Sequence, residues 1–335
     1  MRKLLAGLAL AAAMASLQAT PATAAGKKLI VGTPGIPPIF AATLPIVADK
    51  MGFFKKYGGD VEVKFMESGT TAARALISGD VDVAMAPTPQ VTAQASNAGV
   101  PYVGIFGLPH PDFLLASTDP KKATCKDVVG HSVGVDVIGG ARVVALRLML
   151  APCGVKLDQV KQVALPSTAT QQAMISGRLT YGVLHMDEIP VLEEHGKPIT
   201  EVASIRKANP KAHMVLFTVR SDRLKADREP YVRFVAGLIA AARWMKDPKN
   251  ADKFADIATV TGRTKAEAKS ALEKLEAIDY WPADSGGMDR KQIEGVIVSQ
   301  VKTGNIQPGK TPVAYDKLID NSIYKDAVAL VDKSK

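Results

Sequence analysis

A unit of alternating strands and helices occurs twice in this chain, and this duplication constrains the fold more than any other feature of the sequence. In both copies, β-branched segments alternate with segments whose apolar residues recur at helical spacing. Even the tripeptide Ile77-Ser78-Gly79 has a counterpart in Ile175-Ser176-Gly177. The expected strands are 29–33, 61–65 and 81–85 in the first copy, and 132–136, 159–165 and 179–184 in the second. A repeat of this length indicates a domain topology used twice.

Strands that alternate with helices predict right-handed βαβ units and parallel sheets with helices on both faces. We therefore expect an α/β protein of two doubly wound lobes. Two further β runs, 112–116 and 213–219, are interpreted as the crossings of a hinge. The expected division is 25–116 with 218–335 for lobe one, and 117–217 for lobe two. The region after Asp222 has helical periodicity, and we expect these helices to cover lobe one.

The first residues have the order of a secretory signal peptide. A basic pair, Arg2-Lys3, precedes a short apolar run, and small residues follow as far as Ala24. Ser16 and Gln18 interrupt the run before it reaches the roughly 20 apolar residues that a membrane-spanning helix needs. We expect residues 1–24 to be removed on export.

The charge of the chain is moderately positive and evenly spread. Lys and Arg number 42 against 33 Asp and Glu, which gives a net charge of +9, or +7 without Arg2 and Lys3. A nucleic-acid binder concentrates its basic residues in runs with interleaved aromatic residues, whereas here they are scattered among acidic ones. We expect a soluble protein with no nucleic-acid partner.

Cys125 and Cys153 are the only cysteines. An even pair in an exported chain favours a disulfide over two buried, unpaired thiols. Closing the loop between them would stabilise the fold by roughly 3–4 kcal/mol. The two residues lack C-x-x-C spacing, so they predict neither a zinc site nor thioredoxin-type redox chemistry.

In open α/β sheets, ligands bind beyond the carboxyl ends of the strands, where loops lead into helices. Gly, Ser and Thr at these helix starts leave backbone N–H groups free for a carboxylate, sulfonate or other anion, and Arg142 is a candidate bidentate donor. Each candidate also has a structural alternative: a plain helix cap, turn packing for 37–40, a surface ion pair for Arg142, or a mutual contact between His185 and Asp187. The candidate ligand-binding residues are Gly35, Ile36, Pro37, Phe40, Ser68, Gly69, Thr70, Thr88, Gly139, Gly140, Ala141, Arg142, Ser167, Thr168, His185 and Asp187.

Sequence motifs for catalysis or cofactor binding are not found. Residues 304–311 match the phosphate-binding pattern G-x-x-x-x-G-K-T, but this loop should follow a strand and open a helix, whereas here it follows a helix and runs into Pro312. The five histidines have no metal-ligand spacing. Trp281 is interpreted as a packed aromatic residue rather than a ligand contact. We expect no catalytic residue, no metal, no cofactor and no enzyme activity.

Two segments resemble the NMT1/THI5-like periplasmic solute-binding proteins of ABC importers. They are LPIVADKMGFFKKYGGDVEV at 44–63 and ALISGDVDVA at 75–84. The resemblance implies a periplasmic protein of the type II, Venus-flytrap fold, whose closed lobes are recognised by a membrane permease. By position, it implies ligand loops at 35–36, 68–70, 88 and 139–141. The chain departs from the family pattern at Gly177-Arg178-Leu179-Thr180, where the family has Gly-x-x-Asp, and it lacks the cysteine-rich motif of members that make pyrimidine precursors.

These observations favour a monomeric binding protein that captures a small organic anion of the sulfonate or carboxylate type and delivers it to an ABC permease. Pro37, Ile39 and Phe40 would face the apolar body of such a ligand. Two alternatives stay open at this point: a periplasmic sensor for a signalling receptor, and a binder of a neutral heterocycle such as a pyrimidine. An enzyme of the pyrimidine-synthesis kind would need a cofactor site.

Overall fold

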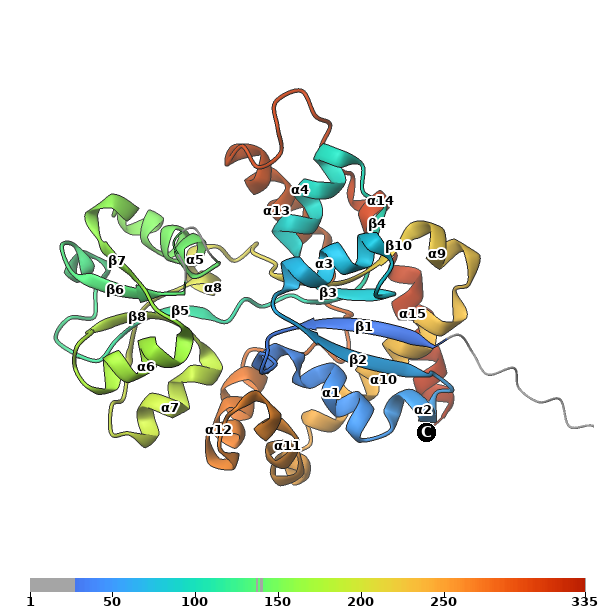
Figure 1. The fold of residues 1–335 in the computed structure, drawn as a ribbon, viewed down its shortest axis with the longest axis horizontal. Coiled ribbons are helices and arrows are strands. Elements are labelled where there is room, and N and C mark those ends of the chain that lie inside the picture. The colour runs from blue at the N-terminus through green and yellow to red at the C-terminus, as the bar shows by residue number, and fades with distance from the viewer. Residues whose placement is uncertain (1–27, 137, 139–140, 335) are drawn as a thin grey trace, which may run out of the picture.

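The computed structural model describes residues 28–136, 138 and 141–334, and these form two lobes, each built on a five-stranded sheet (Figure 1). The predicted α/β class with two doubly wound lobes is confirmed. The predicted signal peptide at 1–24 and two candidate ligand residues, Gly139 and Gly140, lie outside the described residues. Within the described part of the chain, no helix has both the length and the apolar character needed to cross a membrane.

Sheet A, in lobe one, has the strand order β2-β1-β3-β10-β4. β1 pairs in parallel with β2 and β3, as the repeat predicts, whereas β10 runs antiparallel to β3 and β4. The sheet is therefore mixed rather than wholly parallel. Its strands are β1 (Leu29–Pro34), β2 (Val61–Met66), β3 (Val83–Pro87), β4 (Tyr102–Leu108) and β10 (Val215–Arg220).

Sheet B, in lobe two, has the strand order β7-β6-β8-β5-β9. β6 is parallel to β7 and β8, and β5 is antiparallel to both β8 and β9. Its strands are β5 (Phe113–Ser117), β6 (Ser132–Val135), β7 (Lys161–Ala164), β8 (Tyr181–His185) and β9 (Thr200–Ser204). The two sheets thus repeat one arrangement. Three parallel strands are followed by an antiparallel strand that comes from the other lobe, and a fifth strand pairs antiparallel with that one.

The runs 112–116 and 213–219 contain the strands β5 and β10, as predicted, but each strand belongs to one sheet and is not itself the crossing between the lobes. Every residue of β5 is buried, as are the four central residues of β10, which explains their apolar composition. The chain instead changes sheets within 109–112 and 205–214, so the lobe boundaries expected at 116 and 218 fall inside β5 and β10. The Gln292 side-chain amide donates to the carbonyls of Pro109 (3.1 Å) and Ala212 (3.2 Å), one in each segment. We propose that these two segments form the hinge.

Helices cover both faces of each sheet, and alternate strand residues show this directly. In β3, Val83 and Met85 belong to one hydrophobic cluster, while Ala84 and Ala86 belong to another on the opposite face. The helices of lobe one's first half are α1 (Thr43–Lys50), α2 (Phe53–Lys56), α3 (Gly69–Ser78) and α4 (Thr88–Ala98), and those of lobe two are α5 (Ala141–Leu150), α6 (Ser167–Ile175), α7 (Ile189–Glu194) and α8 (Ile205–Ala208).

The C-terminal region is helical and packs on lobe one, as expected (Figure 1). The helical pattern is interrupted between α14 and α15, because the chain extends at Ile319, which bridges to Gly104 of β4. The helices are α9 (Ser221–Ala226), α10 (Glu229–Met245), α11 (Ala251–Ala258), α12 (Lys265–Glu276), α13 (Arg290–Lys302), α14 (Tyr315–Leu318) and α15 (Asn321–Lys333).

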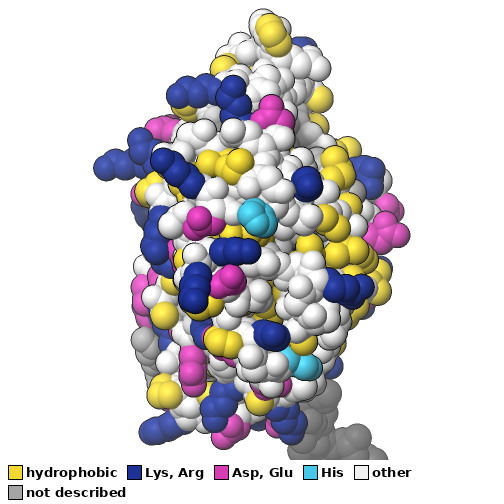
Figure 2. Space-filling view, turned by 90° about the vertical axis from the view of Figure 1, so that its left-hand side faces the viewer, with side chains coloured by type: hydrophobic (Ala, Val, Ile, Leu, Met, Phe, Trp, Pro, Cys, Tyr) yellow, Lys and Arg dark blue, Asp and Glu magenta, His cyan; other side chains and the backbone are white. Residues whose placement is uncertain are grey.

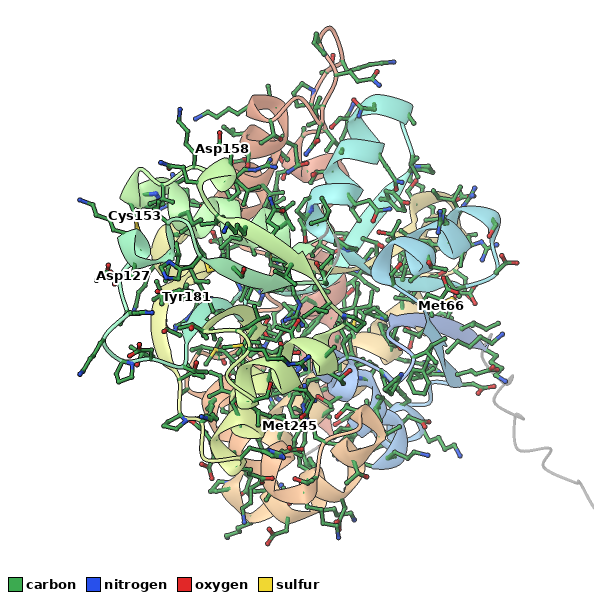
Figure 3. All side chains as sticks on the ribbon, turned by 60° about the vertical axis from the view of Figure 1, so that its left-hand side comes forward. Met66, Asp127, Cys153, Asp158, Tyr181 and Met245 are labelled. Carbon is green, nitrogen blue, oxygen red and sulfur yellow. A yellow bond between two sulfur atoms is a disulfide. The ribbon has the colours of Figure 1, made fainter. Side chains whose placement is uncertain are left out.

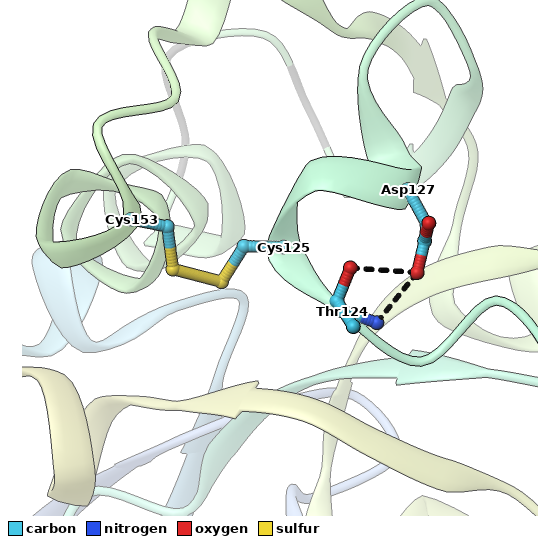
Figure 4. Close-up of a disulfide and its surroundings, with 4 residues drawn as sticks. All are labelled: Thr124, Cys125, Asp127 and Cys153. Atoms are coloured by element: carbon cyan, nitrogen blue, oxygen red, sulfur yellow. Dashed lines mark hydrogen bonds between the residues drawn. A yellow bond between two sulfur atoms is a disulfide. The ribbon is translucent and has the colours of Figure 1, made fainter.

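The predicted disulfide between Cys125 and Cys153 is confirmed (Figure 4). It joins two turns of lobe two, η2 (Cys125–Val128) and η3 (Ala151–Cys153). Thr124 begins the first turn, where its N–H and hydroxyl both donate to the Asp127 carboxylate at 2.9 and 2.7 Å. The Tyr181 hydroxyl on β8 donates to the Asp127 carbonyl at 3.0 Å, which connects this loop to the sheet; Figure 3 labels both residues.

Removing the disulfide should lower the free energy of unfolding. The bridge closes a loop of 28 residues, so replacing both cysteines by Ser is expected to cost roughly 3–4 kcal/mol through the freer unfolded chain. Urea unfolding of the Cys125→Ser, Cys153→Ser variant measures this cost. A reductant should shift the wild-type curve by the same amount and leave the variant unchanged; equal wild-type curves with and without reductant would contradict the prediction.

Candidate functional site

The strand directions place the carboxyl ends of both parallel sets on the sides where the chain crosses between the lobes. Pro87, the last residue of β3, pairs with Val215, the first residue of β10, which the chain reaches from lobe two. Phe113, the first residue of β5, which the chain reaches from lobe one, pairs with His185, the last residue of β8. Because the other parallel strands share these directions, the carboxyl ends of all six strands lie toward the opposite lobe (Figure 1).

The loop after β1 makes a tight turn at Gly35. Its φ is 101°, and an added Cβ would lie 2.5 Å from the Ile39 nitrogen, so only Gly fits. The Gly35 N–H donates to the carbonyl of Met66 at the end of β2 (2.7 Å), which holds the first two loops side by side. The Ile36–Pro37 peptide bond is cis, and both side chains are exposed. This turn therefore presents apolar side chains at the strand ends.

The loops after β2 and β3 also lie together. The Ser68 hydroxyl accepts a backbone N–H of the first turn of α3 at 3.1 Å, as predicted for a cap. Gly69 allows close approach, because an added Cβ would lie 2.8 Å from the Pro87 ring. Thr70 is exposed, and its hydroxyl donates to the Gln90 side chain at 2.8 Å. The structure thus brings Gly35, Ser68 and Thr70 to one edge of lobe one.

Phe40 does not lie on this edge. Its side chain is only 3% exposed, with its ring centroid 5.8 Å from that of Phe254 and 6.2 Å from that of Trp281. Its size and hydrophobicity favour the core of lobe one, so we correct its expected ligand contact to a packing role beneath the loop. Trp281 is a packed aromatic residue, as interpreted.

Thr88 is buried at the start of α4, where its hydroxyl bonds to Nδ1 of His213 at 2.8 Å. Nε2 of His213 lies 2.7 Å from the Gly287 carbonyl. Because a carbonyl only accepts, Nε2 carries the proton and the Thr88 hydroxyl donates to Nδ1. Burial lowers the pKa of His213 to about 4, so the ring is neutral near pH 7. Thr88 therefore holds the second crossing rather than projecting its hydroxyl toward the opposite lobe.

Glu188, three residues after the end of β8, connects the loops of lobe two. Its carboxylate accepts two hydrogen bonds from Arg142 (2.8 and 3.0 Å), one from Gln171 (2.8 Å) and one from the His185 N–H (2.8 Å). Burial alone would raise the pKa of Glu188, but the charge and hydrogen bonds of Arg142 lower it to about 2. One carboxylate thus ties the start of α5 and the middle of α6 to the end of β8.

The expectation that Arg142 offers a free bidentate donor needs correction. The residue is 5% exposed, and its guanidinium donates to the Glu188 carboxylate and to the Val183 carbonyl. The charge would be costly to bury unpaired, which is why it faces a carboxylate instead of the opposite lobe. Arg142 therefore ties the start of α5 to β8 and to Glu188.

His185 and Asp187 do not satisfy each other. Nδ1 of His185 lies 3.0 Å from the Asp112 carboxylate, and its ring lies on Phe113 with centroids 4.1 Å apart. Burial lowers the pKa of His185, but the Asp112 charge and hydrogen bond outweigh it, so the net pKa is raised. Asp187 instead accepts two hydrogen bonds from Arg263, at 2.7 and 3.2 Å.

Asp112, His185 and Asp187 could in principle ligate a metal, since one ligand atom from each lies within 4.8 Å of the others. Their partners point to another interpretation. Asp187 is already neutralised by Arg263, and the Asp112 carboxylate is bonded to the His185 ring. We interpret the group as an ion-pair network.

The remaining candidates lie at helix starts of lobe two. Ala141 is the exposed first residue of α5, and Ser167 begins α6. Thr168 is exposed and lines a surface pocket of about 640 Å³ together with Leu165 and Arg178. Charges of both signs are interspersed on the face of lobe two that Figure 2 shows, in keeping with the scattered charge of the sequence.

Sequence reasoning missed Asp112, Gln171, Glu188, His213 and Arg263. Glu188 was detectable, because it belongs to the same strand-end loop as His185. Arg263 had no local signal, since it lies between two helices and meets Asp187 across 76 positions of sequence.

Replacing Glu188 by Gln should destabilise the fold by roughly 3–5 kcal/mol near neutral pH, because the buried Arg142 charge loses its counter-charge. A carboxyl group with a lowered pKa stabilises the fold above its ordinary pKa of 4.5 and loses that contribution as the pH falls toward 2. The difference between variant and wild type in urea unfolding should therefore shrink over this range. Glu194→Gln, on the exposed end of α7, is the matched control; a difference for Glu188→Gln that did not change with pH would contradict the assignment.

Comparison with known proteins places this geometry in a family. The family described as NMT1/THI5 like matches residues 40–251. The taurine-binding periplasmic protein of Escherichia coli (strain K12) is 26% identical over 225 residues, covering 62% of this chain and 67% of that protein. The periplasmic aliphatic sulphonate-binding protein SsuA from Escherichia coli has a TM-score of 0.66 at 14% identity, over 88% of this chain and 92% of that one.

The fold alone does not separate binding from catalysis. The desulfurization enzyme DSZB has a TM-score of 0.59 at 13% identity, over 90% of this chain and 99% of that one. The family match is more specific, since it covers more than half of the chain, including both crossings and the loops after all six parallel strands except the turn at Gly35. On this evidence, the chain belongs to the NMT1/THI5-like family.

Proposed function

We propose that this protein captures a small organic anion between its two lobes in the periplasm and delivers it to an ABC permease. The observation that carries the proposal is the direction of the strands, which turns the loops of both parallel sets toward each other. The similarity to the taurine-binding and sulphonate-binding proteins supports the same role. Rotation of two lobes about a two-segment hinge is a recurrent way to enclose a ligand.

The exposed side chains at these loops suit a ligand with an apolar body. Ile36 is 70% exposed after β1 and Ile138 is 61% exposed after β6, although large hydrophobic residues ordinarily avoid water. Ile39 and Phe65 are also exposed, at the ends of β1 and β2. Contact with an apolar ligand would remove this surface from water at about 25 cal/mol per Å².

The charged part of the ligand is recognised mainly by backbone groups in this proposal. Arg142 and Arg263, which lie on this side of the lobes, are paired with Glu188 and Asp187. The helix starts remain available for the anion. Their free N–H groups attract negative charge although they carry no formal charge themselves. The proposed contacts are Ile36, Pro37, Ser68, Gly69, Thr70, Ala141, Ser167, Thr168 and His185, with Gly139 and Gly140 in the same loop as Ala141.

A thermal-shift screen tests the ligand class. We expect p-toluenesulfonate or benzoate to raise the melting temperature more than uracil does, because only the anions use the helix starts. Calorimetry should confirm the hits, and the ligand should be recovered unchanged after incubation, as expected of a carrier rather than an enzyme. Stabilisation by neutral compounds alone would contradict the anion assignment, and conversion of the ligand would favour catalysis.

Replacing Ile36 by Ser tests the apolar contact. The loss of this side chain is expected to weaken binding of p-toluenesulfonate by about 1 kcal/mol, roughly fivefold, while binding of taurine changes less. Ile77→Ser is the control, because Ile77 is also an exposed isoleucine, at 38%, but lies near the far end of α3. Equal effects on both ligands would show that Ile36 does not contact the apolar body.

Export and transport are tested in cells. Sequencing of the mature protein from the periplasmic fraction should begin at Ala25, if residues 1–24 are the signal peptide. Uptake of the labelled ligand should fall when the gene is deleted. Normal uptake with loss of a transcriptional or chemotactic response would instead favour the sensor alternative.

A further inference from the structure

The short helix after β8, η5 (Met186–Glu188), contacts both lobes through successive residues. Met186 packs against hydrophobic clusters of lobe one and of lobe two. Asp187 accepts two hydrogen bonds from Arg263, which belongs to the C-terminal region on lobe one. Glu188 holds the start of α5, through Arg142, and the middle of α6, through Gln171, in lobe two. A single helical turn therefore joins the interlobe contact to the proposed ligand loops.

Arg263 is held firmly on the lobe-one side. It lies between η7 (Thr259–Thr261) and α12, next to the N-cap residue Thr264. The Thr264 hydroxyl accepts the Glu267 N–H at 3.1 Å, and the Glu267 carboxylate accepts the Thr264 N–H at 2.7 Å. This reciprocal cap fixes the start of α12, and with it the backbone that carries the guanidinium.

The Arg263–Asp187 pair is largely shielded from water. The side chains are 14% and 10% exposed, and the guanidinium forms two hydrogen bonds to one carboxylate oxygen. Removing one member of such a pair leaves the other charge buried, so a change in lobe orientation that separated them would be opposed. Farther along α12, Lys274 forms a second interlobe pair with Glu193 of α7 at 3.2 Å, and this one is exposed.

The pair also lies close to the first crossing, and the C-terminal region that carries Arg263 contacts the second. His185, two residues before Asp187, bonds to Asp112 at the end of the first crossing. The chain that follows α12 reaches the second crossing, where the Gly287 carbonyl accepts from His213. A contact near the pivot sets the angle between the lobes, since small displacements there become large ones at the loop tips.

We infer that Arg263 is a positioning residue of the ligand site, which fixes η5 against lobe one and so sets the angle at which the two sets of ligand loops face each other. The effect on ligand binding rests on the proposed function, whereas the effect on the lobes does not. Loss of the pair lowers the fraction of molecules with the binding-competent angle, and the apparent affinity falls by the same fraction. Arg263 lies beyond residues 40–251, which the family match covers.

Distances between labels in the two lobes test the inference in the full-length mature protein. Spin labels are placed at Lys55→Cys on α2 and Lys161→Cys on β7, both exposed, with the native disulfide retained. We expect Arg263→Gln and Asp187→Asn each to broaden the interlobe distance distribution. Arg263→Lys, which keeps the charge, should restore part of the wild-type width. The affinity for p-toluenesulfonate should fall roughly tenfold in Arg263→Gln.

Matched variants separate positioning from general stability. Lys269→Gln removes an ion pair between α11 and α12, within lobe one, and should leave the distance distribution unchanged. The double variant Arg263→Gln, Asp187→Asn should behave like either single variant, because all three lose the same contact. If Arg263→Gln does not fold, Lys274→Gln removes the exposed interlobe pair and should broaden the distribution to a smaller degree.

The width of the distribution decides the outcome. If the Arg263→Gln variant folds and its interlobe distance distribution has the wild-type width, the inference is overturned. If that variant does not fold, an unchanged width in Lys274→Gln overturns it. Broadening without binding of any tested compound by the wild type would contradict the proposed function and leave the positioning role of Arg263 in place.

Discussion

β10 enters sheet A against the direction of β3, and β5 enters sheet B against the direction of β8. A strand that arrives from the other lobe must begin on the side nearest that lobe. Because its neighbour runs the opposite way, the neighbour ends on that side. Had either strand been parallel, the carboxyl ends and their helix starts would point away from the partner lobe, and the loops at Gly35, Ser68 and Glu188 could not share a ligand.

The charges near the facing loops are balanced inside the protein. Glu188 neutralises Arg142, Asp187 neutralises Arg263, and Asp112 bonds to His185. Burying these pairs costs desolvation energy. The pairs therefore contribute less to stability than to fixing which residues contact each other. The consequence for the proposed function is specific: Arg142 and Arg263 are paired inside the protein, so the contacts proposed for the ligand are apolar side chains and backbone N–H groups.

Much of the fold could be predicted because the periodicity of apolar residues and the Gly and Pro residues that end helices and strands are local signals. The expected strand at 29–33 is β1 (Leu29–Pro34), and the Ser68 cap lies where expected. β5 and β10 were identified as β runs, but the position of the crossings was not, because an apolar run does not show which sheet it joins. Arg142 was placed at the correct helix start, but its orientation depends on Glu188, 46 positions away. No pattern within one segment records such a partner.

The contacts of the C-terminal region with the crossings are likewise not recorded in its local sequence pattern. Its periodicity predicts only that helices cover lobe one, and the family match stops at residue 251. Yet Gln292 bonds to both crossings, Gly287 bonds to His213 in the second, and Arg263 bonds to Asp187 beside the first. Helices that served only as a cover would need no polar contacts at the pivot. The lobes carry the proposed ligand loops, and we infer that the C-terminal region, by its contacts around the proposed hinge, sets how those loops meet.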